Sequence, residues 1–448
     1  MFATCCVMLR PSPTGACMTT TADSGVFRLA SVGSYLDALS SITDEMSVSD
    51  RTNLIFLDKG LHTIWGLGEN VILNWCADPQ GVGLLVVPHY GVAEYSDEAK
   101  LSDSPQTASE DFFKSLISGR RMLSPTQLEK VAKLLGVEKT SVPLRAPLSQ
   151  DPAHIEIIEK MIKRYSISFV PNRAVALFDI VGFGLLSPFE QMTQLNSLSY
   201  SLNSAYSKML DRKLGISFSR SSTGDGFYIW NRELTVEANV NLYHFMHLVL
   251  ADNAIAGSKA RHRVVPALRA GFHIGSCYEF HQAEGLNPTI YNYIVGDVTI
   301  ELARMIERAL PGQILVGEFE ADLPAGPELE AQVKHMDSID FVHRARNTLT
   351  RLDGLELSGD RVEAIKCYLT GTRLNTGEFT IRKLTINDKH GITRNVFNAK
   401  VNIYRSHAEP ILLGIEDRLL QGTNIPKVTS SHLLPDRAQA TETIRPNA

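Results

Sequence analysis

Two acidic residues, Asp179 and Asp225, have the chemistry and the sequence surroundings of metal ligands. Asp179 lies in the segment Phe-Asp-Ile-Val-Gly-Phe at 178–183, at the end of an apolar run, and Asp225 stands between two glycines in an expected hairpin tip. Carboxylate oxygens are the ligands that Mg²⁺ prefers, and a pair of such ions can hold a triphosphate. The alternative for both residues is a structural role at a strand end or in a turn, where Asp is common.

The elements expected around these carboxylates alternate in a recognisable order. They are a buried strand at 174–181, a helix at 188–211, hairpin arms at 216–221 and 227–230, a helix at 233–254, a strand at 267–274, a strand ending at 293–295, and a helix at 298–310. Strand, helix, two strands, helix and strand is the βαββαβ order. The sequence therefore predicts an α+β fold of ferredoxin-like type.

Residues 171–320 resemble the catalytic domain of the class III adenylate/guanylate (nucleotidyl) cyclase family, as a divergent member. The resemblance is carried by FDIVGF at 178–183, TGDGF at 223–227, ALRAGFHIG at 267–275, YIVGDVTIELAR at 293–304, and ALPGQILV at 309–316. Each piece alone is unspecific, but their order on the expected elements favours the fold. The resemblance covers roughly a third of the chain.

The resemblance implies cyclisation of a nucleoside triphosphate, most simply ATP, at the interface of a homodimer with two Mg²⁺ or Mn²⁺ ions per site. In that family the metal ligands would be Asp179, Asp225 and the backbone of Ile180. The triphosphate would be held by Gly182, Phe183 and Gly224, the base would be read at Ser221 and Tyr293, and the transition state would be stabilised by Arg304.

Three positions depart from the family pattern. Ile300 stands where the family has an Asn that contacts the transition state, and Ser221 and Tyr293 replace the Lys and Asp that read adenine. Hydroxyl groups both donate and accept hydrogen bonds, so this pair fits several bases. Three functions stay open: an ATP cyclase, a cyclase for GTP or a pyrimidine nucleotide, and a catalytically inactive cyclase-fold module that binds nucleotide or a partner.

Composition narrows the class of protein. The chain has 448 residues, of which 44% are hydrophobic, and this length predicts more than one core. A formal net charge of −5 gives no general attraction to nucleic acid or anionic lipid. No run of 18 or more apolar residues occurs, so we expect no membrane span and a cytoplasmic location.

The flanking segments are expected to form separate parts. They are a disordered tail at 1–25, a small α/β sensor-like domain at 26–100, a helical connector at 101–170, a β-containing accessory module at 330–422, and a disordered tail at 423–448. Within the second part, residues 53–66 read as two strands around an Asp-Lys-Gly turn, followed by a strand at 81–88. The helix at 153–165 favours either an ordinary packing helix or a parallel dimer stalk. Two strands at 378–387 and 393–404 predict a hairpin.

Overall fold

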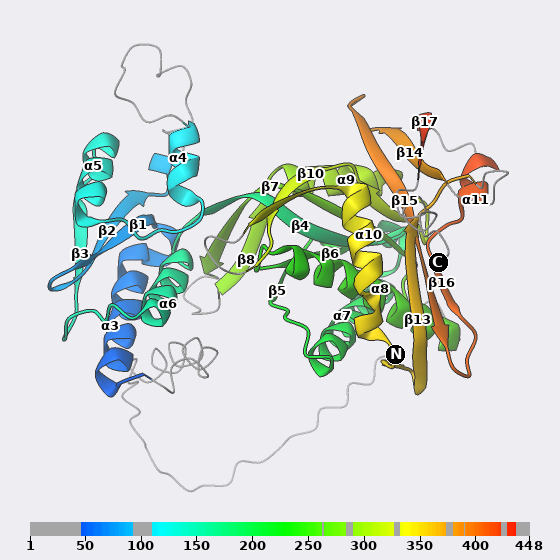
Figure 1. The fold of residues 1–448 in the computed structure, drawn as a ribbon, viewed down its shortest axis with the longest axis horizontal. Coiled ribbons are helices and arrows are strands. Elements are labelled where there is room, and N and C mark those ends of the chain that lie inside the picture. Colours follow the sequence, from blue (N-terminus) through cyan, green and yellow to red (C-terminus); the bar gives the residue numbers. More distant parts are fainter. Residues whose placement is uncertain are drawn as a thin grey trace, which may run out of the picture.

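In this computed structural model, the structure describes residues 46–92, 110–261, 264–283, 290–326, 332–372, 380–388, 390–422 and 428–435. The described chain has an N-terminal region with its own three-stranded sheet and a larger region built on a twelve-stranded sheet (Figure 1). The tail expected at 1–25 lies outside the described residues. No helix within the described ranges is long and apolar enough to cross a membrane.

The N-terminal region packs helices on a small antiparallel sheet of order β1-β2-β3. Its elements are α3 (Val48–Trp65), η1 (Gly66–Gly68), β1 (Asn70–Asp78), β2 (Gly81–Pro88), α4 (Glu110–Ile117), α5 (Pro125–Leu135), β3 (Lys139–Pro143) and α6 (Pro152–Lys163). β2 has the predicted bounds. β3 and α6 fall in the segment expected to be a connector, but they complete this sheet and its core.

The prediction of two strands at 53–66 is wrong, because this segment belongs to helix α3. The buried apolar side chains recur at helical spacing, at Leu54, Leu57, Leu61 and Trp65. Gly60 is not a turn residue: a Cβ there would lie 2.6 Å from a methyl of Val142, so glycine permits the close packing of α3 against β3.

Helix α6 is a packing helix of the N-terminal region, and the interpretation as a dimer stalk is not supported. Its apolar side chains are at most 6% exposed and lie in one core with α3 and β1; they are Ile155, Ile157, Ile158, Met161 and Ile162. Glu159 on the same helix accepts a 2.8 Å hydrogen bond from the indole of Trp75 in β1. A helix buried in this way has no apolar face left for a parallel partner.

The central region follows the predicted element order closely. Its elements are β4 (Ser168–Ile180), η4 (Phe183–Leu185), α7 (Pro188–Asp211), β5 (Phe218–Ser222), β6 (Gly226–Asn231), α8 (Val236–Lys259), β7 (Leu268–Ala283), β8 (Ile290–Val295), α9 (Asp297–Arg308) and β9 (Ile314–Gly317). α7 begins at a capping box in which Ser187 and Glu190 bond each other's backbone N–H.

Strand order confirms the ferredoxin-like α+β fold. The strands run β7-β4-β6-β5 across the sheet, and every neighbouring pair is antiparallel. This is the arrangement that a βαββαβ chain adopts when each helix crosses over the same face. Helices α7 and α8 share one core cluster with that face, whereas α9 packs in a second cluster on the opposite face.

Side chains of β4 alternate between these two cores. Ala174, Ala176, Phe178 and Ile180 belong to the cluster under α7 and α8, whereas Val175 and Leu177 belong to the cluster with α9. Successive side chains of a strand point to opposite faces of its sheet. By this alternation Asp179 emerges on the face that α9 covers.

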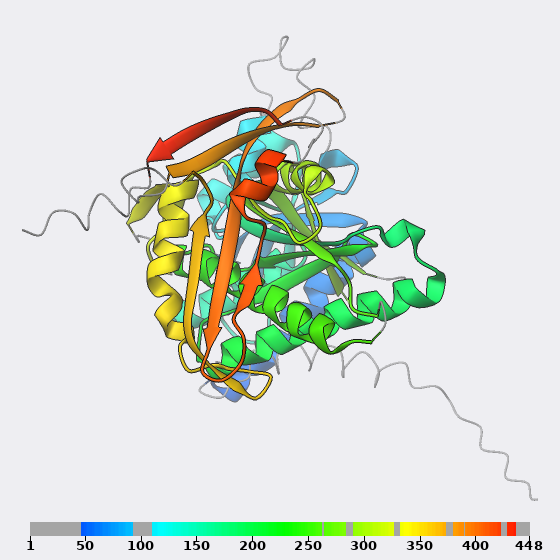
Figure 2. The ribbon, with the colours of Figure 1, turned by 90° about the vertical axis from the view of Figure 1, so that its right-hand side faces the viewer.

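The C-terminal part of the described chain contains β10 (Glu320–Pro324), β11 (Val333–Asp337), α10 (Ser338–Thr348), η5 (Leu349–Leu352), β12 (Glu356–Leu357), β13 (Asp360–Leu369), β14 (Thr380–Asn387), β15 (Thr393–Arg405), β16 (Ile411–Leu413), α11 (Asp417–Gly422) and β17 (Val428–Pro435). β10 and β11 pair in a two-stranded sheet of their own, and the other strands extend the twelve-stranded sheet. β9 pairs with β15, so the sheet continues through β15, β13 and β12 (Figure 2).

The structure differs from the expectations of a separate module at 330–422 and of a disordered tail at 423–448. The strands at 360–413 share the main core cluster with α8 and β7, so they are not packed as a separate module. The hairpin of β14 and β15 is present as predicted. Residues 428–435, expected within a disordered tail, form β17 and pair with β14; the rest of that tail lies outside the described residues.

Candidate functional site

The structure brings Asp179 and Asp225 together at the ends of β4 and β6. In the β4/β6 register Asp179 lies opposite Gly226, and the backbone N–H of Ile180 donates a 3.0 Å hydrogen bond to the carbonyl of Asp225. Gly226 is required at this point, because a Cβ there would lie 1.9 Å from the carbonyl oxygen of Phe178. Strand pairing therefore fixes both carboxylates relative to each other.

Asp179 is buried and forms an ion pair with Arg269. The Nε of Arg269 donates a 2.6 Å hydrogen bond to Oδ2 of Asp179, and the two residues lie opposite each other in the β4/β7 register. Burial raises the pKa of Asp179 above its ordinary value, Arg269 opposes that rise, and the carboxylate of Asp225 adds to it. The guanidinium of Arg269 thus partly compensates the negative charge of Asp179 and Asp225.

Tyr228 lies on β6 beside the carboxylate pair. Its hydroxyl donates a 3.0 Å hydrogen bond to the carbonyl of Thr299 on α9. Burial raises the pKa of this phenol, and the negative charges of Asp179 and Asp225 raise it further. This hydrogen bond anchors the start of α9 to β6, the strand that follows Asp225.

The loop after β4 has the open backbone expected of a phosphate cradle. Val181 donates a 2.9 Å hydrogen bond to Ala267, and the chain then turns at Gly182, whose φ of +69° favours glycine. Gly182 and Gly224 are exposed, whereas Phe183 is partly buried against the main core. The predicted substrate-binding residues at 182, 183 and 224 therefore flank the carboxylates.

The donor set at this site fits a magnesium or manganese ion. Carboxylate oxygens from Asp179 and Asp225, with the backbone carbonyl of Ile180, are hard oxygen donors of the kind Mg²⁺ takes. Within the described residues no cluster of three or more His, Cys, Asp or Glu side chains could hold a metal ion by itself. Mg²⁺ commonly keeps waters and substrate phosphates as its other ligands, so two carboxylates suffice when a triphosphate is bound.

Arg304 lies apart from the carboxylates of its own chain. Its side chain is 25% exposed on α9 and is surrounded by Glu307 at 3.6 Å, Asp388 at 3.8 Å and His390 at 3.3 Å. Among the interactions of the described residues, none joins Arg304 to Asp179 or Asp225. The structure therefore does not bring this predicted residue to the site within one protomer.

The two predicted base-reading positions lie on strands that contact each other but are not hydrogen-bonded neighbours. β5, which carries Ser221, packs against β8, which carries Tyr293. The Tyr293 ring is 38% exposed and stacks on Phe280, with ring centroids 5.6 Å apart and planes inclined by 16°. Ile300, at the position of the expected Asn, is 51% exposed on α9. It offers only an apolar surface there.

Sequence reasoning missed the cationic partner of the site. Arg269 belongs to the segment 267–275 already singled out, and aligning that strand antiparallel to 174–181 places it opposite Asp179. The antiparallel register was the available signal. For Asp388, which contacts Arg304 across 84 positions of sequence, no local pattern gave a signal.

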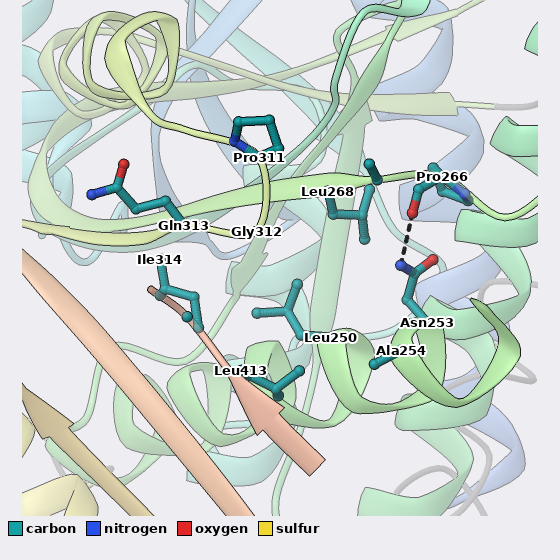
Figure 3. A pocket seen from close by; sticks show the side chains of 12 residues that line it. Leu250, Asn253, Ala254, Pro266, Leu268, Pro311, Gly312, Gln313, Ile314 and Leu413 are labelled. Carbon is teal, nitrogen blue, oxygen red and sulfur yellow. Dashed lines mark hydrogen bonds between the residues drawn. The ribbon is translucent and has the colours of Figure 1, made fainter. Parts of the chain in front are cut away.

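A cavity of about 360 Å³ lies near the start of β7, away from these residues. Its wall is mostly apolar, with Leu250, Leu268, Ile314 and Leu413 around it, and the Nδ2 of Asn253 donates a 2.9 Å hydrogen bond to the Pro266 carbonyl (Figure 3). None of the predicted site residues lines this cavity. It is therefore not the site of the expected chemistry.

Comparisons with known proteins return catalytic domains of nucleotidyl cyclases among solved structures. These include the guanylyl cyclase Cya2 (12% identity, TM-score 0.28, 52% of this chain and 92% of that chain) and the adenylyl cyclase CyaB from P. aeruginosa (13%, 0.28, 54% and 97%). Adenylate cyclases from Trypanosoma brucei in their monomeric state give 11%, 0.29, 54% and 93%. No family model and no curated protein sequence matches the chain.

Proposed function

We propose that the protein is a nucleotidyl cyclase that converts a nucleoside triphosphate, most simply ATP, to its 3′,5′-cyclic monophosphate and pyrophosphate. The observation that carries the proposal is that the pairing of β4 with β6 brings Asp179 beside Asp225 in a ferredoxin-like sheet. In the reaction the 3′-hydroxyl loses its proton and its oxygen bonds to the α-phosphorus. The bond from that phosphorus to the β-phosphate oxygen breaks, and pyrophosphate leaves.

Each part of the site has a defined role in this proposal. Asp179 and Asp225 would hold Mg²⁺ or Mn²⁺, which supplies charge neutralisation and a more acidic 3′-hydroxyl when it is bound. The exposed backbone of 182–183 and of Gly224 would lie against phosphate oxygens. Arg269 limits the electrostatic repulsion between the two carboxylates before a ligand arrives, because its guanidinium is bonded to one of them.

The position of Arg304 supports a site shared between two protomers. A transition-state cation must reach the phosphoryl group, and among the described residues no hydrogen bond or ion pair joins Arg304 to Asp179 or Asp225 of its own chain. Exposed apolar side chains occur on α7 and its approach, on β8 and on α9, at Leu185 (92% exposed), Phe189 (70%), Met192 (54%), Val295 (47%) and Ile300 (51%). We infer that a second copy covers these residues and supplies Arg304 to the site.

A second candidate function is a cyclase-fold module that binds nucleotide without turning it over. It is favoured by Ile300, whose apolar side chain cannot donate a hydrogen bond to the transition state. It is also favoured by the full set of neighbours around Arg304, since a phosphate must compete with them for the guanidinium. Retention of both carboxylates favours the enzyme.

The base preference of the proposed enzyme is expected to be broad. Ser221 and Tyr293 offer hydroxyl groups and no fixed charge, and a site without fixed partners discriminates weakly between substrates. GTP and pyrimidine nucleotides therefore belong among the substrates to be tested. Replacing the pair by the charged residues of adenine-reading members, Ser221→Lys with Tyr293→Asp, should shift the ratio of kcat/KM values toward ATP.

The test is to incubate the purified full chain with each of the four ribonucleoside triphosphates and Mg²⁺ or Mn²⁺, and to search for cyclic products by mass spectrometry. Equilibrium binding of each nucleotide is measured in parallel. Cyclic product that disappears in Asp225→Asn supports the enzyme. Tight binding without product supports the inactive module, and neither binding nor product contradicts both.

A further inference from the structure

One face of α9 is joined to the tip of the β14–β15 hairpin. Glu301, Arg304 and Arg308 recur at helical spacing, and each has a partner at the tip. Glu301 accepts a 2.7 Å bond from Nε of Arg394, and Nε of Arg308 donates a 2.9 Å bond to the carbonyl of Asn387. The hairpin is therefore attached to the helix on both sides of Arg304.

Asp388 is the buried residue at the centre of the contact between α9 and the β14–β15 tip. Its side chain is only 2% exposed, and its Oδ1 accepts hydrogen bonds from the backbone N–H of His390 (2.8 Å) and Ile392 (2.9 Å). Burial alone would raise the pKa of Asp388, but these two N–H groups and Arg394 hold it below its ordinary value. The carboxylate is thus ionised and held rigidly within the turn.

The second oxygen of Asp388 faces two arginines. Oδ2 accepts a 2.7 Å bond from Nη1 of Arg394 and lies 3.8 Å from Nε of Arg304. On the outer side of Arg304, Nη2 lies 3.3 Å from Nε2 of His390 and Nη1 lies 3.6 Å from Glu307. The inner, Nε side is the buried one, because Asp388 is covered whereas His390 and Glu307 are exposed.

We propose that Asp388 is a positioning residue that orients Arg304 for the cyclisation reaction, and that the β14–β15 tip is the element that supplies it. The inference rests on the proposed function, in which Arg304 stabilises the transferring phosphoryl group. A buried carboxylate on the Nε edge restricts rotation of the guanidinium and directs its Nη edge outward. A phosphate oxygen then displaces only the exposed partners His390 and Glu307.

The test compares Asp388→Asn with wild type in the full chain. Asn keeps the side-chain size and an oxygen for the two backbone N–H groups, but it removes the charge that faces Arg304. We expect kcat to fall about 10- to 100-fold, the usual cost of removing a partner of a functional group, with KM within about twofold. In an Arg304→Ala background Asp388→Asn should cause no further loss, because its effect passes through the arginine.

Two further variants keep the inference open to contradiction. His390→Ala removes an exposed partner that the phosphate must displace from Arg304, so kcat should stay unchanged or rise. A fall in kcat in this variant would contradict the inference even should Asp388→Asn fail to fold. Asp360→Asn is the matched control. Asp360 also accepts backbone N–H bonds in the C-terminal region, from His407 and Ala408, and forms no hydrogen bond or ion pair with α9 among the described residues. Its kcat should equal that of wild type.

The outcomes separate this inference from the proposed function. An active wild type whose kcat is unaffected by Asp388→Asn, or is lowered by His390→Ala, overturns the positioning role alone. An equal further loss in the Arg304→Ala background also overturns it, since the effect would then be a general one on stability. A wild type that neither binds nor cyclises any of the four triphosphates overturns the proposed function and this inference together.

Discussion

The carboxylate half of the proposed site and the arginine half are built in different ways. Asp179 stands at the end of β4 and Asp225 directly before its neighbour β6, and a backbone hydrogen bond from Ile180 to Asp225 joins the two segments. Arg304 stands on the outer face of a helix and depends on a hairpin more than 80 residues later for its orientation. Backbone pairing determines the positions of the two carboxylates, whereas interactions between charged side chains determine the orientation of Arg304.

This difference indicates which kind of substitution each half of the site tolerates. Paired strands tolerate a change of surface charge. They do not tolerate a shift of register or a side chain that occupies the space beside a neighbouring backbone. A side-chain network tolerates small backbone shifts but fails when one charged member is lost, because the remaining charges are left unpaired. We therefore expect steric substitutions to disturb the geometry of the carboxylate half and charge substitutions to disturb the geometry of the arginine half. Loss of a carboxylate itself acts through metal binding and not through this geometry.

The largest expected effect is the loss of a metal ligand. Asp179→Asn should lower kcat/KM by at least about 10³-fold, because metal-ion stabilisation of transition-state charge is worth several kcal/mol. Steady-state kinetics measure this. Asp252→Asn is the matched control, since Asp252 pairs with Lys208 between α7 and α8 and is not part of the site. Unchanged activity in Asp179→Asn would exclude that residue as a ligand.

A steric change should break the carboxylate half without touching a charge. Gly226→Ala places a Cβ 1.9 Å from the Phe178 carbonyl oxygen, and a backbone atom in a strand cannot turn aside. We expect a loss of more than about 3 kcal/mol in the free energy of unfolding, measured with urea, together with most of the activity. Gly224→Ala is the control for space, because no atom lies within 4 Å of its Cβ position. Its φ of +95° should cost only about 1 kcal/mol.

Mixing variants tests whether the two halves meet across a dimer. Asp225→Asn and Arg304→Ala should each lose most of the activity alone. Together they should recover about a quarter of wild-type activity, because half of the randomly mixed dimers are heterodimers and each has one intact site of two. Activity of the mixture is measured after subunit exchange has been demonstrated by native mass spectrometry. Exchange without recovery would place both halves in one protomer.

A more general effect concerns the stability of the core that supports both halves. Burial lowers the pKa of His244 and of His273 to about 4 each, below the value of about 6.5 expected in the unfolded chain. Their neutral forms therefore stabilise the fold above pH 6.5, and this contribution is lost as the pH falls from 6.5 toward 4. The expected loss is roughly 1.4 kcal/mol per pH unit for each histidine. Urea unfolding at pH 7, 6 and 5 measures it, with His273→Gln expected to flatten the profile.

Most of the fold and the carboxylate half could be predicted from the sequence, because their signals are local. The apolar runs and the glycine-flanked Asp225 define β4, β6 and the turn, and the helix at 188–211 begins at a capping box that is legible in the sequence. The segment 53–66 misled because Asp58 and Gly60 imitate a turn, although tertiary packing against Val142 selects a helix there. The contact of Asp388 with Arg304 depends on how β15 joins β9, which no spacing reveals.

The alternation along β4 limits how this protein can change by insertion or deletion. Phe178 fills the core beneath α7 and α8, and Asp179 emerges on the opposite face. One residue added between Ala174 and Phe178 would exchange the side chains that point to each face of the sheet. The Asp179 carboxylate would then point into the core under α7 and α8, and the Phe178 ring would point toward α9. Neither fold nor site could then be retained. Insertions and deletions of a single residue are therefore not tolerated in β4. We expect length variation only in the loops at its ends.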